Sequence, residues 1–207
     1  YLSTVTDKRG TTVFEYDEAN RLKSKTDPDG TKVFYTYDKQ GNVETITSKA
    51  GTIKYTYDEI GRLSTVEDQW GGITKYEYDE VGNLIKEIKP NGTIAKYTYD
   101  DLNRLIKLEN IKDDGTVLSS YTYTLGPSGN RIKVVENTGR TVDYEYDKLY
   151  RLVKETITQP DGKTRVISYT YDAVGNRLEK NDDGVITKYK YDKNDRLLTE
   201  GEIKYSY

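Results

Sequence analysis

The sequence contains no cysteine, no histidine and no methionine. Without cysteine the chain forms no disulfide and offers no thiolate. Without histidine and cysteine it cannot build a Ser-His-Asp triad, a Cys-His dyad or a typical zinc site. Paired carboxylates are the one broad catalytic option that remains. These absences disfavour most classes of enzyme.

Hydrophobic residues are also scarce, at 34% of the 207 residues, whereas charged residues reach 32%. Typical globular domains are roughly 45–50% apolar, so this chain lacks the material for a thick aliphatic core. Disordered chains share this polarity, but an aromatic content of 12%, placed at regular intervals, argues against disorder. A thin sheet stabilised by aromatic rows and cross-strand charge pairs fits the composition.

The charge pattern restricts the partners that we expect. The net charge is −3, and Lys and Arg are spread evenly, without the basic stripe that binds nucleic acid. No apolar run approaches the ~20 residues of a membrane span, and no signal peptide opens the chain. Because the chain starts and stops inside repeats, we expect a piece of a longer protein. The lack of cysteine, histidine and methionine together fits either a compositionally biased bacterial exoprotein or a consensus-like engineered sequence.

Tyrosine is the abundant residue: 19 of the 21 tyrosines belong to a Tyr-x-Tyr string, usually followed by Asp, that returns about every 21 residues. Such a fixed period is typical of repeat architectures, in which each unit packs only on its neighbours. We interpret residues 1–207 as a single array of about nine to ten units of 20–25 residues, without a second domain. The repeat positions are Tyr16, Asp17, Tyr37, Asp38, Tyr57, Asp58, Gly61, Tyr78, Asp79, Gly82, Tyr99, Asp100, Tyr146, Asp147, Tyr171, Asp172, Gly175, Tyr191 and Asp192. Tyr121-Thr122-Tyr123 is taken as the sixth string, although no Asp follows it.

Residues 57–78 illustrate one unit. Asp58 is expected to form an Asx-type bond, and Gly61 to adopt a positive φ, in a turn that leads to a strand over 63–67. A second turn over 68–72 leads to the return strand over 73–78. Each unit is thus a β-hairpin plus a connector. The sequence predicts an all-β fold, a repeat array of antiparallel β-hairpins.

Strand periodicity assigns the side chains to two faces. Because side chains alternate, Tyr55 and Tyr57 share one face with Ile53, opposite Lys54 and Thr56. Leucines of the adjacent strands are expected to pack on this tyrosine face: Leu22, Leu63, Leu84, Leu105, Leu152 and Leu197. Apolar pairs three residues apart share a face only if a bulge intervenes, which the sequence leaves open for Leu63/Val66, Leu105/Leu108 and Ile132/Val135.

The recurring Asp residues are interpreted as turn formers, because catalysis needs one special pair and these occur in almost every unit. The Asp-Gly turns lack the EF-hand spacing, so hairpin chemistry is favoured over weak calcium binding. The tyrosine face is interpreted as structural, with stacking on sugar rings as the alternative. Trp70, in a Gly-flanked turn, is interpreted as a turn filler rather than a binding anchor. No catalytic residue, metal ligand or cofactor is assigned.

The segments 57–63, 78–84 and 171–178 follow a Tyr-Asp-x-x-Gly pattern that resembles the YD repeat of the RHS (rearrangement hotspot) family of bacterial polymorphic toxins, wall-associated proteins and teneurins. The resemblance covers essentially the whole chain. It implies a curved or spiralling β-strip, an open arc of the hollow shell that in the toxins encloses a C-terminal toxic domain, and a secreted or cell-surface location. Asp27-Pro28-Asp29-Gly30 matches the family's self-cleavage segment only superficially, because it lies in an ordinary hairpin turn.

The resemblance implies a non-catalytic scaffold, an arc of an extracellular shell that encapsulates or presents a toxin or other domain. The expected partners are the rest of the parent RHS protein and an enclosed C-terminal toxin domain. The alternative is a module that binds carbohydrate or a cell-surface receptor through the tyrosine face or the hairpin tips. About 19–20 strands at ~4.8 Å give a strip of roughly 90 Å, whose unpaired edges favour edge-to-edge self-association.

Overall fold

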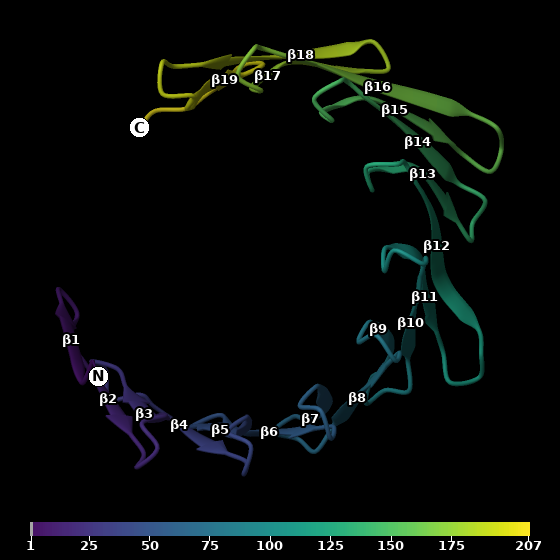
Figure 1. The fold of residues 1–207 in the computed structure, drawn as a ribbon. Helices are drawn as coiled ribbons and strands as arrows, with labels where there is room; N and C mark the ends of the chain where they lie inside the picture. Colours follow the sequence, from purple (N-terminus) through teal and green to yellow (C-terminus); the bar gives the residue numbers. More distant parts are fainter. Residues whose placement is uncertain (1) are drawn as a thin grey trace. The chain divides into compact units, whose positions relative to one another are not determined.

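The computed structural model describes residues 2–207, which contain twenty β-strands and no helix (Figure 1). All twenty strands belong to one sheet, in which β1 pairs with β2 and β20 pairs with β19. The predicted all-β class is therefore confirmed. The strands are β1 (Thr4–Asp7), β2 (Gly10–Tyr16), β3 (Leu22–Thr26), β4 (Lys32–Tyr37), β5 (Val43–Ser48), β6 (Gly51–Tyr57), β7 (Leu63–Glu67), β8 (Ile73–Tyr78), β9 (Leu84–Ile88), β10 (Ile94–Tyr99), β11 (Leu105–Ile111), β12 (Val117–Leu125), β13 (Arg131–Glu136), β14 (Thr141–Tyr146), β15 (Leu152–Thr158), β16 (Thr164–Tyr171), β17 (Arg177–Asp182), β18 (Val185–Tyr191), β19 (Leu197–Glu200) and β20 (Ile203–Lys204).

The chain comprises two compact units, residues 2–96 with 111–116, and residues 97–110 with 117–207. In the first unit, the strands from β1 to β10 pair with their sequence neighbours in antiparallel fashion. In the second unit, the strands from β12 to β20 do the same. Within each unit the hairpins therefore follow one another in chain order (Figure 1).

Three-residue loops close most hairpins, both at the turn after each Tyr-Asp string (the near turn) and at the opposite ends of the strands (the far turn). At a near turn, the Asp58 N–H donates to the Arg62 carbonyl (2.8 Å) and the Gly61 N–H to the Asp58 carbonyl (3.0 Å). Gly61 has a φ of 82° and Gly30, in a far turn, has a φ of 83°, as a type I turn followed by a left-handed residue requires. The predicted hairpins are confirmed. Most Asp-Gly pairs lie in these longer loops, whereas Asp183 and Gly184 form a two-residue turn in which both φ angles are positive.

A β-bulge follows most near turns. Tyr57 pairs with Leu63 and Thr56 with Thr65, so that Ser64 has no opposite residue. The extra residue restores Val66 to the tyrosine face, opposite Tyr55, because a bulge shifts the alternation by one. This resolves the question that the Leu63/Val66 spacing left open. The same register shift occurs at the ends of β2, β4, β8, β12, β14, β16 and β18.

The assignment of Tyr121-Thr122-Tyr123 as the sixth string is wrong by two residues. Leu125, not Tyr123, pairs across the bulge, and the near turn runs from Gly126 to Asn130. Leu125 and Gly126 thus take the places that Tyr57 and Asp58 hold in the type unit. The turn sets the register, since Gly129 supplies the left-handed residue with a φ of 82°.

The pair Ile132/Val135 does not follow the rule of Leu63/Val66. Ile132 is the extra residue of its bulge, and Val135 pairs with Thr122 on the face opposite the tyrosines. Both side chains are 38% exposed. The three-residue spacing therefore carries two different meanings, depending on where the near turn places the bulge.

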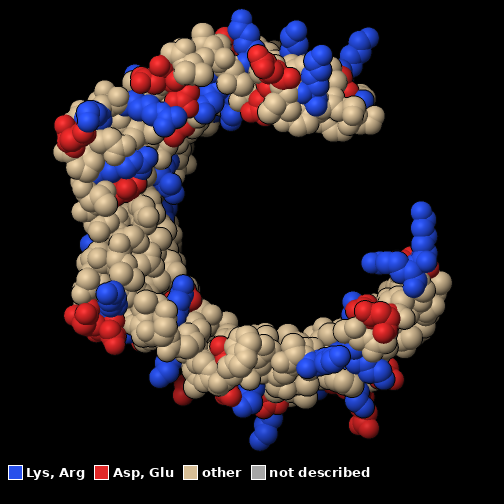
Figure 2. All heavy atoms as spheres, turned by 180° about the vertical axis from the view of Figure 1, so that it is seen from behind, with Lys and Arg blue, Asp and Glu red and all other residues tan. Residues whose placement is uncertain are grey.

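The sheet has little buried apolar material. Among the described residues, the buried hydrophobic side chains are Ala95, Val134, Val142, Ile157 and Ile167. In β6 the half-buried Tyr55 and Tyr57 alternate with exposed Lys54 and Thr56, which confirms the predicted two faces. On the face drawn in Figure 2, acidic and basic side chains are interspersed along both units. Single-layer packing explains how a chain with so few hydrophobic residues forms an extended sheet.

Candidate functional site

The near turns form the most regular chemical feature of the molecule. At Asp58, one carboxylate oxygen accepts the N–H groups of Ile60 (3.1 Å) and Arg62 (2.8 Å), and the other accepts Nε of Arg62 (2.7 Å). The hydrogen bond from the Arg62 side chain has the largest effect in lowering the pKa of Asp58, and the bond from the Arg62 N–H lowers it further. Arginine four residues after the Asp makes the same pair at Asp17, Asp100, Asp147 and Asp192. Asn42, Asn83 and Asn176 take this role at Asp38, Asp79 and Asp172.

The left-handed position of the near turn accepts glycine and a few other residues. Gly61, Gly82 and Gly175 have φ angles of 82°, 98° and 103°. Asn20 and Asn103 hold the equivalent position with φ angles of 63° and 58°, since Asn tolerates this conformation better than most side chains. Tyr150 and Asp195 also occupy it. The sequence identified the glycines of this position but not its other occupants.

The second tyrosine of most strings binds the unit before it. The Tyr78 hydroxyl donates to the carbonyl of Leu63 (2.9 Å), and the Tyr57 hydroxyl donates to the carbonyl of Val43 (2.9 Å). Burial raises the pKa of Tyr57, as it does for Tyr37. The same bond to a preceding carbonyl is made by Tyr16, Tyr37, Tyr146 and Tyr171. Tyr99 and Tyr191 end β10 and β18 at the equivalent position.

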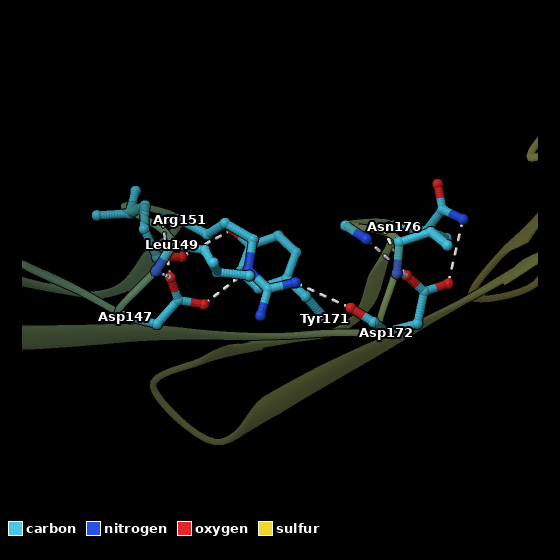
Figure 3. Close-up of polar contacts among 9 residues, drawn as sticks. Asp147, Leu149, Arg151, Tyr171, Asp172 and Asn176 are labelled. Atoms are coloured by element: carbon cyan, nitrogen blue, oxygen red, sulfur yellow. Dashed lines mark hydrogen bonds and ion pairs between the residues drawn. The ribbon is translucent and has the colours of Figure 1, made fainter.

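The arginine of one near turn lies over the tyrosine of the next. The Arg62 guanidinium is 4.8 Å from the centroid of the Tyr78 ring and donates Nη1 to the Asp79 carbonyl (3.0 Å). Arg151 repeats the arrangement over Tyr171, at 5.0 Å, with a 2.9 Å bond to the Asp172 carbonyl (Figure 3). We call these residues the ladder: the second Tyr and the Asp of each string, with the Arg or Asn four residues after the Asp. Sequence reasoning missed this contact, although the Arg or Asn at a fixed distance from each Asp was its visible signal.

The ladder offers little free chemistry. Its carboxylates accept bonds from their own turns, and no described side-chain polar atom is buried without a hydrogen-bond partner. Within residues 2–207 no group of three acidic side chains is arranged to hold a metal ion, and no helix is long and apolar enough to span a membrane. Asp27 to Gly30 form a far turn. Trp70 stands at a far turn with its side chain 83% exposed, so it fills no packed space there.

The ladder is interrupted once in the second unit. Leu125 and Gly126 replace a tyrosine and an aspartate. Arg104 still donates Nη1 to the Gly126 carbonyl (3.3 Å), but a leucine stands where its aromatic partner would be. The interruption leaves a hollow of about 420 Å³, lined by Arg104, Leu125 and Arg131 among others.

Comparisons with solved structures find the same fold in larger proteins. The crystal structure of TcdB2-TccC3-TEV matches with a TM-score of 0.79 and 19% identity, over 95% of this chain and 13% of that chain. TcdB2-TccC3 without its hypervariable C-terminal region matches with a TM-score of 0.78 and 19% identity, over 94% and 12%. The Tc holotoxin pore of Photorhabdus luminescens matches with a TM-score of 0.56 and 20% identity, over 90% and 10%. These likenesses concern the fold, and this chain spans about an eighth or less of those chains.

Sequence comparison is more specific. No curated protein matches the chain. The RHS Repeat family matches residues 2–32 and 16–53. The Teneurin YD-shell family matches residues 42–153, which is more than half of the chain. Together with the repeated Tyr-Asp turns, these matches show that the chain belongs to the RHS/YD-repeat family.

Proposed function

We propose that this strip is a non-catalytic wall segment of an RHS-type shell that encloses or presents another polypeptide domain. The carrying observation is the ladder, in which each unit spends its Asp, Arg and Tyr groups on its own turn and on the adjacent unit. Such uniform use of ionisable groups suits a scaffold, since a catalytic site needs groups whose environment differs from the rest. The repeat residues Tyr57, Asp58 and Gly61, and their equivalents, serve this architecture.

The partners follow from the same proposal. The strip continues into the rest of a parent RHS protein, and a toxin or other C-terminal domain is the enclosed cargo. One similar structure was solved without its hypervariable C-terminal region and another is a holotoxin pore, which supports a toxin as the cargo class. A secreted or cell-surface location follows from that role.

Protease protection tests the proposal in the polypeptide that carries this strip. Segments outside the repeats should resist a protease of broad specificity in the parent protein. They should be cut rapidly in a variant with Tyr57→Leu and Tyr78→Leu, which removes two ladder bonds. A Trp70→Ala variant, altered at an exposed far turn, is the matched control and should protect like the parent. Equal cutting in the parent and the ladder variant would refute the enclosing role.

Surface recognition is the second candidate function, and the exposure of Trp70 is the observation that favours it. A nearly free indole at a far turn provides a face on which a sugar ring or a receptor side chain stacks. A glycan array should then give a signal that Trp70→Ala abolishes and Phe34→Ala, at another exposed aromatic residue, leaves intact. A signal that survives Trp70→Ala, or no signal, would exclude the turn as an anchor.

A further inference from the structure

We propose that the hollow beside Leu125 is a subsite for a carboxylate, specifically an Asp or Glu side chain of a bound polypeptide. The inference rests on the proposed function only in that an enclosed polypeptide would supply this ligand. It concerns the one place in the second unit where the ladder lacks both its ring and its carboxylate. The hollow is thus a consequence of two substitutions within the repeat.

The shape of the hollow follows from the missing ring. In the type unit the Tyr78 ring lies beneath Arg62 and its hydroxyl reaches the Leu63 carbonyl. Leu125 is too short to repeat these contacts with Arg104 and Leu105. The resulting space of about 420 Å³ has Arg104, Leu105, Leu125, Arg131, Tyr144 and Tyr146 among its lining residues.

Arg131 gives the hollow its charge. Eight of the ten arginines form an ion pair with a carboxylate. Arg131 forms none with a described residue. It stands where the type unit has Leu63, pairs with Leu125, and lies over the Tyr123 ring at 4.4 Å from the centroid. Its side chain is exposed on the tyrosine face.

Two acids that share a hollow with Arg131 have other partners. Glu136 and Glu155 line the adjoining hollow together with Arg131. Glu136 pairs with Arg140, and Glu155 accepts the Tyr169 hydroxyl at 2.6 Å. The Arg131 guanidinium therefore presents donors in a planar fork that matches a carboxylate.

The backbone and the walls complete the site. The Tyr146 hydroxyl donates to the Arg131 carbonyl (2.7 Å), which fixes the strand that carries the guanidinium. Arg104, although paired with Asp100, adds a second positive group. The leucine side chains of the walls cannot form hydrogen bonds with the hydroxyl groups of a sugar, and burying those hydroxyls without partners would be costly. A carboxylate flanked by aliphatic or aromatic side chains, as in a peptide, fits better than a sugar acid.

Binding of a defined probe to the intact chain tests the subsite. The probe is a capped, fluorescently labelled peptide with one Glu between Leu and Tyr, and its control is the same peptide with Gln. We expect the Glu peptide to bind at least about 10-fold more tightly than the Gln peptide, because the Gln peptide lacks the charged hydrogen bond between carboxylate and guanidinium. Added salt should weaken its binding.

Three variants separate the hollow from general charge. Arg131→Leu installs the residue common to this position, and Leu125→Tyr fills the space, so both should fold and lose the preference for Glu. Arg177→Leu is the matched control, since Arg177 also replaces a leucine but lies between the rings of Tyr169 and Tyr189, at 4.8 and 5.6 Å. It should keep the preference.

Three outcomes would overturn the subsite: equal binding of the Glu and Gln peptides, equal loss in Arg131→Leu and Arg177→Leu, or binding of oligogalacturonate without binding of the Glu peptide. The last would assign the hollow to acidic sugars. Protease protection is an independent readout of the shell. Protection without peptide binding refutes the subsite alone, and peptide binding without protection refutes the shell alone.

Discussion

Exchanging the residue types at positions 78 and 125 tests how much the ladder stabilises the strip. Tyr78→Leu creates in the first unit the interruption that Leu125 makes in the second. Leu125→Tyr repairs the natural interruption, because the new hydroxyl is placed to reach the Leu105 carbonyl and the new ring lies beneath Arg104. The two substitutions are mirror images, so they should change stability in opposite directions.

The structure sets the size of the effect. Tyr78→Leu removes a half-buried hydrogen bond of 2.9 Å to the Leu63 carbonyl, worth about 0.5–1.5 kcal/mol. It also removes the Arg62 contact at 4.8 Å, worth about 0.5–1 kcal/mol at a surface site. The expected loss is about 1–2.5 kcal/mol, and the expected gain from Leu125→Tyr is about 1–2 kcal/mol.

Urea unfolding followed by far-ultraviolet circular dichroism measures both changes. Since repeat arrays unfold with nearest-neighbour coupling, the curves are fitted with a nearest-neighbour scheme as well as by their midpoints. Thermal midpoints should move by roughly 2–4 °C per kcal/mol for a chain of this size. Changes of the same sign, or both within about 0.3 kcal/mol of the parent, would refute the ladder as a source of stability.

Four further results are expected. Hydrogen bonds from Arg165 and, to a smaller extent, Lys180 lower the pKa of Asp182 from 3.8 to about 2. The stability that this carboxylate contributes above pH 3.8 should therefore be lost as the pH drops toward 2, and Asp182→Asn should flatten this loss in urea titrations at acid pH. Burial raises the pKa of ladder tyrosines above their ordinary 10.0, so stability should fall as the pH rises beyond 10; a flat alkaline profile would contradict this. Gly61→Ala meets no atom within 4 Å but must hold a φ of 82°, which should cost about 1–2 kcal/mol in thermal unfolding, and Gly61→Asn should cost less. The Ser3 carbonyl accepts the Phe14 N–H of β2, and backbone groups of successive residues in a strand point to opposite sides, so the Thr4 N–H faces away from β2. Thr4→Pro should therefore reduce concentration-dependent association in light scattering, unless the unsubstituted chain is monomeric throughout.

The fold was predictable because two periods coincide in the sequence. The Tyr-x-Tyr alternation specifies strands with one half-buried face, and Asp and Gly at fixed distances specify turns between them. Even the bulge after each near turn has a sequence trace, in the three-residue spacing of Leu63 and Val66. No competing helical period was present to obscure these signals.

The ladder contacts and the interruption were harder to predict. A bond from Tyr78 to the Leu63 carbonyl joins residues of neighbouring units, and sequence spacing alone does not show which donor reaches which acceptor. At the sixth string, Tyr121 and Tyr123 keep the spacing of a ladder pair, yet the near turn begins at Gly126. Turn geometry fixes the register there, so the tyrosine pattern misplaced the string by two residues and hid the hollow.

The most direct test of the account is a double-mutant cycle across one step of the ladder. Arg62→Leu and Tyr78→Leu, alone and together, isolate the coupling between adjacent units, because each removes the contact between guanidinium and ring, and Arg21→Leu with Tyr78→Leu serves as a distant control pair. The ladder predicts a coupling of about 0.5–1 kcal/mol for the adjacent pair and none for the distant pair. Additive effects for Arg62 and Tyr78 would show that neighbouring units are not joined through these side chains and would contradict the account.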